Sequence, residues 1–556
     1  MLKIRNVFVT FATVFAISSA YALIGIQDAK AQAYEDLLKR IEALEARPGG
    51  NVNAPKIRGL KMGFAIRHRF EDQIQFFSSR GLATPAVNAA GQLVQGGEAG
   101  IAKVRGGTGR SARDEDFVLQ RVRIYFDADV NKNVRGFVKL QDSRTLGESN
   151  IADNEERTDL LEAFVELRNL GDLSPMLSNL NLKIGRWQAH YGNHRLIGTL
   201  NWANQARSYD GARLKWSNKK NAWIDLFAHQ IQEEDTGGVS GSRQQTDNSA
   251  GTTSLQARDE VIYGIYSQFK FSGALEGNLV EPYFIARSRS DDVNLSGDRD
   301  TGEVRYSAGF RLDGRKMPSL AGLDYTVEPV WQFGKVNGVR GETANLGADL
   351  NPAAGNSGDT SDSIQAWAIY AGAGYTFKDM PWTPRIGYAY VFASGDDKPL
   401  TGSAKTFDHL YPTGHAQLGY IDNAAWQNIE DHQIHLSFKP TKKLLVDLKG
   451  HIFSLDEEAD AWYSVGGGTG YGGGRGVIRA GADQFINSAG VLENVDDDLG
   501  QEIDLTVKYK LFKNFSVVAG YSHYFADDFI EDTGGGGGNG IDRGADWVYL
   551  MTSMKF

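Results

Sequence analysis

The chain of 556 residues contains no cysteine and only 13 prolines. Without cysteine, its fold does not rely on disulfide bonds. Beyond residue 30, no stretch approaches the roughly 20 consecutive apolar residues that a membrane-spanning helix requires. Segments with the period of an amphipathic helix are also scarce, and the mean hydropathy is polar at -0.37. These absences disfavour a disulfide scaffold, a helical membrane protein and a helical multidomain enzyme.

The N-terminus has the three parts of an export signal. Lys3 and Arg5 give a charged start, residues 7–26 are largely apolar, and the small residues of A-Q-A end at Ala33. This arrangement predicts cleavage after Ala33, so residues 1–33 are interpreted as a signal peptide. The alternative is that the apolar run is retained as a membrane anchor.

Residues 34–55 are predicted to form a short periplasmic helix and a linker. Apolar side chains recur at coiled-coil spacing over 34–46, and R-P-G-G at 47–50 then ends the helix. Two heptads are marginal as an isolated helix. One interpretation is a short helix without a partner, and the other is a small coiled coil that joins the chains of a homotrimer.

From about residue 60, the dominant period is two. Over 303–312, Val304, Tyr306 and Phe310 fall on one face, and Glu303 and Arg305 fall on the other. Successive side chains of a strand point to opposite faces, so such segments are predicted strands. The predicted strands are 61–71, 116–130, 134–142, 159–169, 180–187, 208–217, 221–231, 259–271, 278–290, 302–313, 322–335, 363–377, 384–393, 429–439, 442–455, 499–511, 514–525 and 544–556.

The connections between these strands alternate between short and long. Strict alternation is typical of a bacterial outer-membrane barrel, which has short periplasmic turns, long extracellular loops and an even number of strands. A soluble sandwich gives no reason for it. We therefore predict an all-β fold over 56–556, a transmembrane antiparallel β-barrel of about 18 strands. Its expected location is the cell outer membrane, and its expected partners include outer-membrane lipid and the barrel-assembly machinery, with no nucleic acid.

The face opposite the lipid is predicted to be basic over the first ten strands, although the whole chain has a net charge of -10. A basic lumen concentrates anions, and rings of Arg or Lys select anions in pores. Pairing with the acids on the same face is the alternative role for these side chains. The predicted lumen-facing basic residues are Arg67, Arg69, Arg121, Arg123, Arg135, Lys139, Arg168, Lys183, Arg213, Lys215, Lys270, Arg287, Arg289, Arg305 and Arg311.

Catalytic and metal-binding motifs give no strong signal. There is no G-x-S-x-G or P-loop, so the protein is not expected to be an enzyme. His190 and His194 are four residues apart, but Gly192 indicates a loop rather than a helix that would pair them on a metal. No cofactor is expected. The loop acids Asp396 and Asp397 leave Ca²⁺ binding open, with solubility as the alternative.

Two stretches go beyond the general pattern of a barrel. The first runs from I-G-R-W-Q at 184–188 to S-Y-D-G at 208–211, and the second runs from 387 to 422 and includes A-S-G-D-D and T-F-D-H-L-Y-P. Together they resemble the alginate-export family of outer-membrane barrels. The residues that carry the resemblance include Gly185, Arg186, Tyr191, Gly192, Asn201, Trp202, Asp210, Gly395, Asp396, Phe407 and Asp408.

The resemblance implies an eighteen-stranded barrel with an arginine-rich pore that secretes an anionic polysaccharide. The expected function is therefore an outer-membrane channel for the passive passage of anionic solutes. A general or anion-selective porin for small molecules is the first alternative. A surface adhesin or scaffold whose loops bind a partner is the second.

Overall fold

The computed structural model describes residues 58–76, 86–87, 93–94, 113–147, 156–231, 260–289, 303–315, 317–337, 361–397, 402–463, 465, 477–479, 496–529 and 544–556. The chain divides into two units, Met1–Lys56 and Ile57–Phe556, and the second is described here. The predicted signal peptide (1–33) and the predicted helix and linker (34–55) lie outside the described residues.

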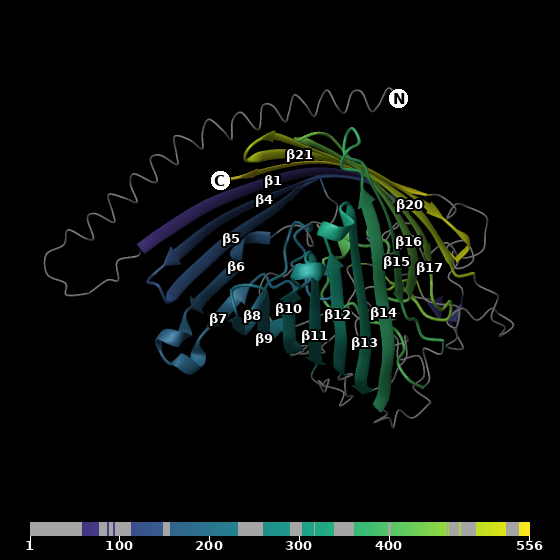
Figure 1. Cartoon of the computed structure of the whole chain (residues 1–556). Helices are drawn as coiled ribbons and strands as arrows, with labels where there is room; N and C mark the ends of the chain where they lie inside the picture. The colour runs from purple at the N-terminus through teal and green to yellow at the C-terminus, as the bar shows by residue number, and fades with distance from the viewer. Residues whose placement is uncertain are drawn as a thin grey trace, which may run out of the picture. The chain divides into compact units, whose positions relative to one another are not determined.

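The second unit is a closed antiparallel β-barrel of 18 strands (Figure 1). Each barrel strand pairs with the next one along the chain, and the last strand pairs with the first, Met551 lying opposite Arg69. The barrel strands are β1 (Arg58–Phe76), β4 (Arg113–Asp129), β5 (Val134–Leu146), β6 (Glu156–Leu167), β7 (Leu180–Trp187), β8 (Tyr209–Ser217), β9 (Ala222–Ile231), β10 (Glu260–Lys270), β11 (Asn278–Arg289), β12 (Glu303–Gly314), β13 (Leu323–Asn337), β14 (Ser361–Thr376), β15 (Arg385–Ala393), β16 (Ile429–Thr441), β17 (Leu444–Ser454), β20 (Asp498–Phe512), β21 (Phe515–Ala526) and β22 (Ala545–Lys555).

These elements confirm the predicted fold class and strand number. The predicted strand at 180–187 coincides with β7, and the other predicted boundaries differ from the observed ones by a few residues. Two small pairs were not predicted: β2 (Ala86–Val87) with β3 (Leu93–Val94), and β18 (Trp462–Tyr463) with β19 (Val477–Arg479). Both are too short for a period of two to be recognised.

The predicted alternation of connections is also present. The short connections are 130–133, 168–179, 218–221, 271–277, 315–322, 377–384, 442–443 and 513–514. Asparagine side chains shape several of them: Asn131 Oδ1 accepts the N–H groups of Asn133 and Val134, and Asn218 Oδ1 accepts those of Lys220 and Asn221. An Asn side chain that replaces a backbone acceptor in this way stabilises a tight turn.

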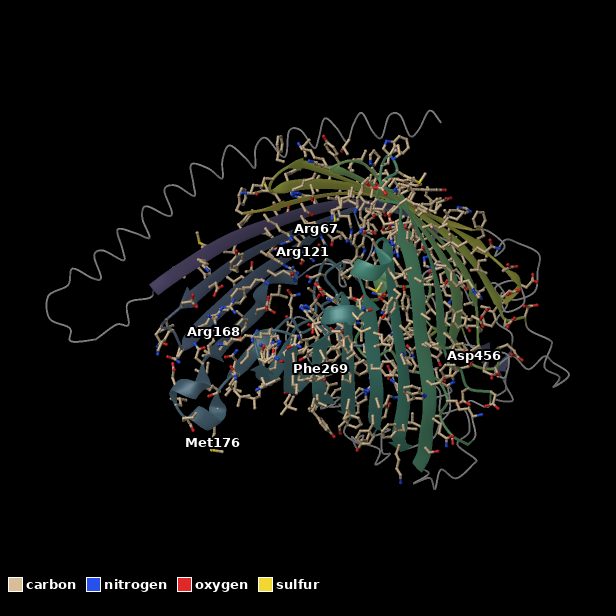
Figure 2. The ribbon with its side chains drawn as sticks, in the orientation of Figure 1. Arg67, Arg121, Arg168, Met176, Phe269 and Asp456 are labelled. Atoms are coloured by element: carbon tan, nitrogen blue, oxygen red, sulfur yellow. The ribbon has the colours of Figure 1, made fainter. Side chains whose placement is uncertain are left out.

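The helical elements of the turns and loops are short. In the part of the chain that the structure describes, they include the 3-10 turns η2 (Leu170–Asp172), η3 (Pro175–Leu177), η4 (Gly273–Leu275), η5 (Pro318–Leu320) and η6 (Gly414–Ala416). Met176 of η3 is almost fully exposed at one of the short connections (Figure 2). Within the described residues, no helix has the length and apolar character needed to cross a membrane.

Burial is inverted relative to a soluble protein. Arg305 on β12 and Glu502 on β20 are each 1% exposed, whereas Phe333 and Ile503 on the same or neighbouring strands are each 46% exposed. The alternation of strand side chains puts the charged set inside and the apolar set outside. An apolar outer surface around a polar interior is what a barrel surrounded by lipid requires.

Candidate functional site

Two long segments fold into the barrel and meet there. We call residues 188–208 the β7–β8 loop and residues 394–428 the β15–β16 loop. They form a parallel bridge at Ile197 and Tyr411, where Tyr411 N donates to Leu196 O at 2.8 Å and Gly198 N donates to Tyr411 O at 2.8 Å. Ile197 is 1% exposed and Tyr411 is 4% exposed, so the loops share a dry contact. Together they form a constriction of the barrel interior.

The β7–β8 loop is held to the wall in two ways. Arg195 forms a buried ion pair with Glu328 of β13 at 2.7 Å, and residues 201–203 are held through their backbone carbonyls. Arg67 donates to Asn201 O at 2.9 Å and to Ala203 O at 3.0 Å. Arg121 donates to the same two oxygens at 3.0 and 2.9 Å. Arg69 donates to Trp202 O at 2.6 Å and lies 4.2 Å from the centre of the Trp202 ring. Three arginines of β1 and β4 therefore position a three-residue segment of this loop.

The β15–β16 loop is held to the opposite part of the wall through a carboxylate. Asp408 is fully buried and pairs with Arg287 of β11 and, at 3.7 Å, with Arg305 of β12. The backbone of Asp408 also donates to Gln332 Oε1 at 2.9 Å, and the Gln332 amide donates back to Asp408 O at 2.7 Å. The negative charge of Asp408 in the loop thus neutralises positive charge of Arg287 and Arg305 on the wall.

Farther along, the same loop reaches β20. Tyr420 N and Ile421 N donate to the Glu502 carboxylate at 2.5 and 2.9 Å. The His415 ring stacks on Trp202 of the β7–β8 loop, with ring centres 4.0 Å apart and an angle of 8° between the planes. The β15–β16 loop therefore runs across the interior from β11 and β12 to β20, and it contacts the β7–β8 loop on the way.

Ten of the fifteen basic residues predicted to face the lumen pair with an acid in the described part of the chain. The pairs are Arg69–Glu71, Arg135–Asp127, Lys139–Glu162, Arg168–Glu166, Arg213–Asp225, Lys215–Asp225, Arg287–Glu303, Arg289–Glu260, Arg305–Glu303 and Arg311–Glu281. Pairing is thus the commoner arrangement. Lys270, also predicted to face the lumen, is exposed at the short-turn end of β10.

Besides Lys270, four of the fifteen have no acid within 4.0 Å among the described residues: Arg67, Arg121, Arg123 and Lys183. Arg123 donates to Gln141 Oε1 at 2.8 Å and to Asn201 Oδ1 at 2.9 Å. Lys183 lies 4.0 Å from the centre of the Phe164 ring and opposite Arg213 in the strand register. These four cations leave positive charge beside the constriction.

The glycines of the resemblance are explained by close approach. Gly185 has φ +128°, and a Cβ there would lie 2.8 Å from Phe164 Cα. A Cβ on Gly192, which has φ +52°, would lie 2.7 Å from the hydroxyl of Tyr266. Only glycine allows both the backbone conformation and the contact. Tyr191 stacks on Tyr266 at 4.6 Å, which fixes the start of the β7–β8 loop against β10.

The other residues of the resemblance divide between the constriction and its surroundings. Asn201, Trp202 and Asp408 form the contacts described above, and Phe407 is fully buried near Trp426. Arg186 pairs with Asp210 at 3.0 Å across β7 and β8, on the outward side that also carries Ile184. The pair of Arg186 and Asp210 therefore links two barrel strands on their outer side and does not line the lumen.

Asp396 and Asp397 have protein partners. Asp396 Oδ2 accepts Lys405 N at 3.2 Å, and Asp397 pairs with Lys405 Nζ. In the described residues, the acidic groups that gather three ligand atoms within 4.8 Å are Asp496, Asp497 and Asp498, which are exposed. Burial raises the pKa of the Asp460 carboxyl, which accepts Asp396 N, to about 6. The Ca²⁺ hypothesis at Asp396 and Asp397 gains no third acidic ligand from these contacts.

The closed barrel with its apolar outer surface defines a bacterial outer-membrane protein whose interior is narrowed by two loops. The chain belongs to the alginate export family, which it matches over residues 101–540. No curated protein matches it. Its structure is similar to that of Pseudomonas aeruginosa OccK2 (OpdF) in complex with glucuronate, at 12% identity and TM-score 0.49, over 90% of this chain and 98% of that one. Acinetobacter baumannii OccAB1 is similar at 12% identity and TM-score 0.48, over 91% and 99%.

Proposed function

We propose that the protein is a passive channel for anionic solutes, with an anionic polysaccharide as the first candidate. The observation that carries the proposal is the group of four lumen-facing cations, Arg67, Arg121, Arg123 and Lys183, without an acid in ion-pair range among the described residues. Positive charge in a narrow, low-dielectric passage attracts anions and raises their local concentration. Membership of the alginate export family supports a polymer that carries carboxylates.

Passage needs contacts that are weak and repeated. The loose ion pairs of the wall supply them: Arg213 lies 3.6 Å from Glu166 and 3.7 Å from Asp225, and Lys215 lies 3.5 Å from Asp225. A solute carboxylate exchanges with these acids at little cost, because each cation keeps a partner throughout. Several such sites in sequence let an anion enter and leave without being trapped.

A channel for small anions is the second candidate. It is favoured by the contacts between the two loops, Ile197 with Tyr411 and Trp202 with His415, which keep part of the lumen filled. Small solutes can pass beside a filled constriction, whereas a polymer chain needs a wider passage.

The test is conductance of the full-length protein in liposomes. Reversal potentials in a KCl gradient are expected to show a preference for Cl⁻. Block by oligouronates but not by phosphate supports the polysaccharide, and equal block by both supports small anions. Arg121→Gln with Lys183→Gln is expected to reduce the preference, whereas Arg144→Gln, which replaces an outward-facing arginine paired with Asp142, is the matched control. A channel without anion preference contradicts the proposal.

A further inference from the structure

The arginines around the constriction differ in their partners: some pair with acids, whereas others donate only to neutral oxygens. We infer that Arg67, Arg121 and Arg123 form a carboxylate-binding site, and that a uronate bound there releases residues 201–203 of the β7–β8 loop from the wall, while Arg195 of the same loop keeps its buried ion pair with Glu328 of β13. The inference rests on the proposed passage of anions and adds to it the class of ligand and the part that moves.

The three guanidinium groups are brought together by the strand register. Arg67 of β1 lies directly opposite Arg121 of β4 (Figure 2). Arg123 follows two residues later on the same face of β4. Their present acceptors are neutral: the carbonyls of Asn201 and Ala203, and the side-chain amide oxygens of Asn201 and Gln141. Three positively charged guanidinium groups therefore lie side by side and donate hydrogen bonds only to uncharged oxygens among the described contacts.

The nearby acids are engaged elsewhere. Glu71 pairs with Arg69, and Glu162 pairs with Lys139. Two donors of the three arginines are buried without any acceptor among the described residues, Arg67 Nε and Arg123 Nη2. Arg67 itself is 7% exposed. A buried guanidinium with an unused donor and no carboxylate is incompletely satisfied, and an anion would complete it.

A carboxylate is a stronger acceptor than the carbonyls that now occupy the site. Hydrogen bonds from arginine to a carboxylate are charge-assisted and often form in parallel pairs. The carbonyls of Asn201 and Ala203 each accept from both Arg67 and Arg121, so one ligand carboxylate competes with four hydrogen bonds of the loop. Ligand binding and attachment of the loop at 201–203 therefore exclude one another.

Oligouronates fit this site better than a single small anion does. Arg121 and Arg123 are two residues apart along one face of β4, so their side chains are spaced roughly 6.5–7 Å apart along the strand. A chain with a carboxylate on successive sugar rings can engage both positions with one molecule, and linked binding raises its effective concentration at the second position. Inorganic phosphate and monomeric glucuronate test the shared anion chemistry without the linkage.

The experiment measures the reactivity of a single cysteine in the full-length protein in liposomes, since the natural chain has none. Ala206 of the β7–β8 loop and Ala425 of the β15–β16 loop are each 1% exposed. We expect oligouronate to raise the modification rate of Ala206→Cys by a neutral methanethiosulfonate at least fivefold. Monomeric glucuronate and phosphate are expected to give less, and a neutral oligosaccharide no change. Ala425→Cys is the matched control and is expected to stay within twofold.

Variants identify the site. With Arg121→Gln, the response of Ala206→Cys to oligouronate is expected to disappear, and its basal rate to rise, because the carbonyls lose two donors. Arg144→Gln, on the outward face of β5, is expected to keep the full response. Arg121→Lys gives the same comparison if the Gln variant does not fold, because it keeps the charge but not the forked geometry.

The outcomes are distinguishable. An equal response to neutral oligosaccharide, an equal response of Ala425→Cys, or a full response in folded Arg121→Gln overturns the inference. Reversal potentials are measured on the same preparations. Anion preference without a response of Ala206→Cys would leave the proposed function in place and remove the inference, whereas loss of both would remove the proposed function as well.

Discussion

Two attachments inside the barrel differ in their chemistry. The β15–β16 loop brings its own carboxylate, Asp408, to the wall arginines Arg287 and Arg305. Residues 201–203 of the β7–β8 loop bring neutral carbonyls to Arg67 and Arg121, although Arg195 of the same loop forms a buried ion pair with Glu328. At Asp408 and Arg195 the charge is neutralised within the protein, whereas at residues 201–203 the arginines have no acid and remain open to a ligand. We therefore expect the charged attachments to persist and the attachment at residues 201–203 to be exchangeable for an anion.

The largest expected effect tests the fixed attachment. Asp408→Ala removes a fully buried carboxylate from Arg287 and Arg305, which then share the single carboxylate of Glu303 as their closest acid. Breaking a buried ion pair costs about 3–5 kcal/mol. Such a loss corresponds to more than roughly 100-fold in a local opening equilibrium. Modification of Ala425→Cys is expected to accelerate accordingly. Asp397→Ala, in an exposed pair with Lys405, is the control, and a similar rise there would contradict the assignment.

The next effect concerns the side chain that joins the loops. Trp202 stacks on His415 and lies edge-on to Trp547 and Tyr549. Trp202→Ala is expected to cost about 2 kcal/mol of local stability, below the 3–5 kcal/mol of a fully buried Trp, because Trp202 is half-buried. Ala206→Cys is then expected to react roughly 30-fold faster, with Ala425→Cys little changed. Equal acceleration at both positions would mean that the loops open as one body.

A smaller effect is expected from pH. Burial, together with the charge of the neighbouring His190, lowers the pKa of His194 in the β7–β8 loop to about 4. A neutral His194 is compatible with the folded loop, and the loop loses stability as the pH falls from the ordinary pKa near 6.5 to about 4, because the released side chain takes up a proton more readily. The thiolate fraction falls with pH at any cysteine, so the rate at Ala206→Cys is divided by the rate at Ala425→Cys at each pH. This ratio is expected to be several-fold higher at pH 4 than at pH 7.5. His194→Asn, which tolerates the φ of +61°, should remove most of that difference, and an unchanged pH profile would exclude His194 as the cause.

The smallest effect addresses the cation away from the loop carbonyls. Lys183 packs over Phe164 and holds no carbonyl of the constriction loops among the described contacts. Lys183→Gln is expected to lower the ratio of anion to cation permeability about twofold, because one charge of a multi-charge field is removed. The rate at Ala206→Cys should stay the same. A changed rate would show that lumen charge and loop attachment are not separate properties.

The barrel could be predicted almost completely from the sequence, and the constriction could not. The period of two and the alternation of connections depend on local physics, so β7 was predicted to the residue. The lumen face of β12 was also correct from parity, since Arg305 and Arg311 are buried and Phe310 is not. Which of these cations are paired depends on their neighbours on adjacent strands, and the register between strands cannot be read from the sequence.

The sequence contains only a weak indication that the two loops enter the lumen. Leu196-Ile197 and Leu410-Tyr411 are apolar pairs in segments otherwise typical of solvated loops, and all four side chains are buried. Apolar pairs in a long loop indicate that it packs against something. They do not indicate what, because the bridge between Ile197 and Tyr411 joins residues more than two hundred positions apart.

The most direct test of the account locks the two loops together. Ile197→Cys with Tyr411→Cys replaces bridged residues, whose separation suits a disulfide, in a chain without other cysteines. If the β7–β8 loop must leave the fixed β15–β16 loop to open the passage, liposomes that contain the oxidised protein should take up little labelled oligouronate. The same protein after reduction should take up more. Equal uptake of oligouronate through the oxidised and reduced forms would contradict a movable β7–β8 loop.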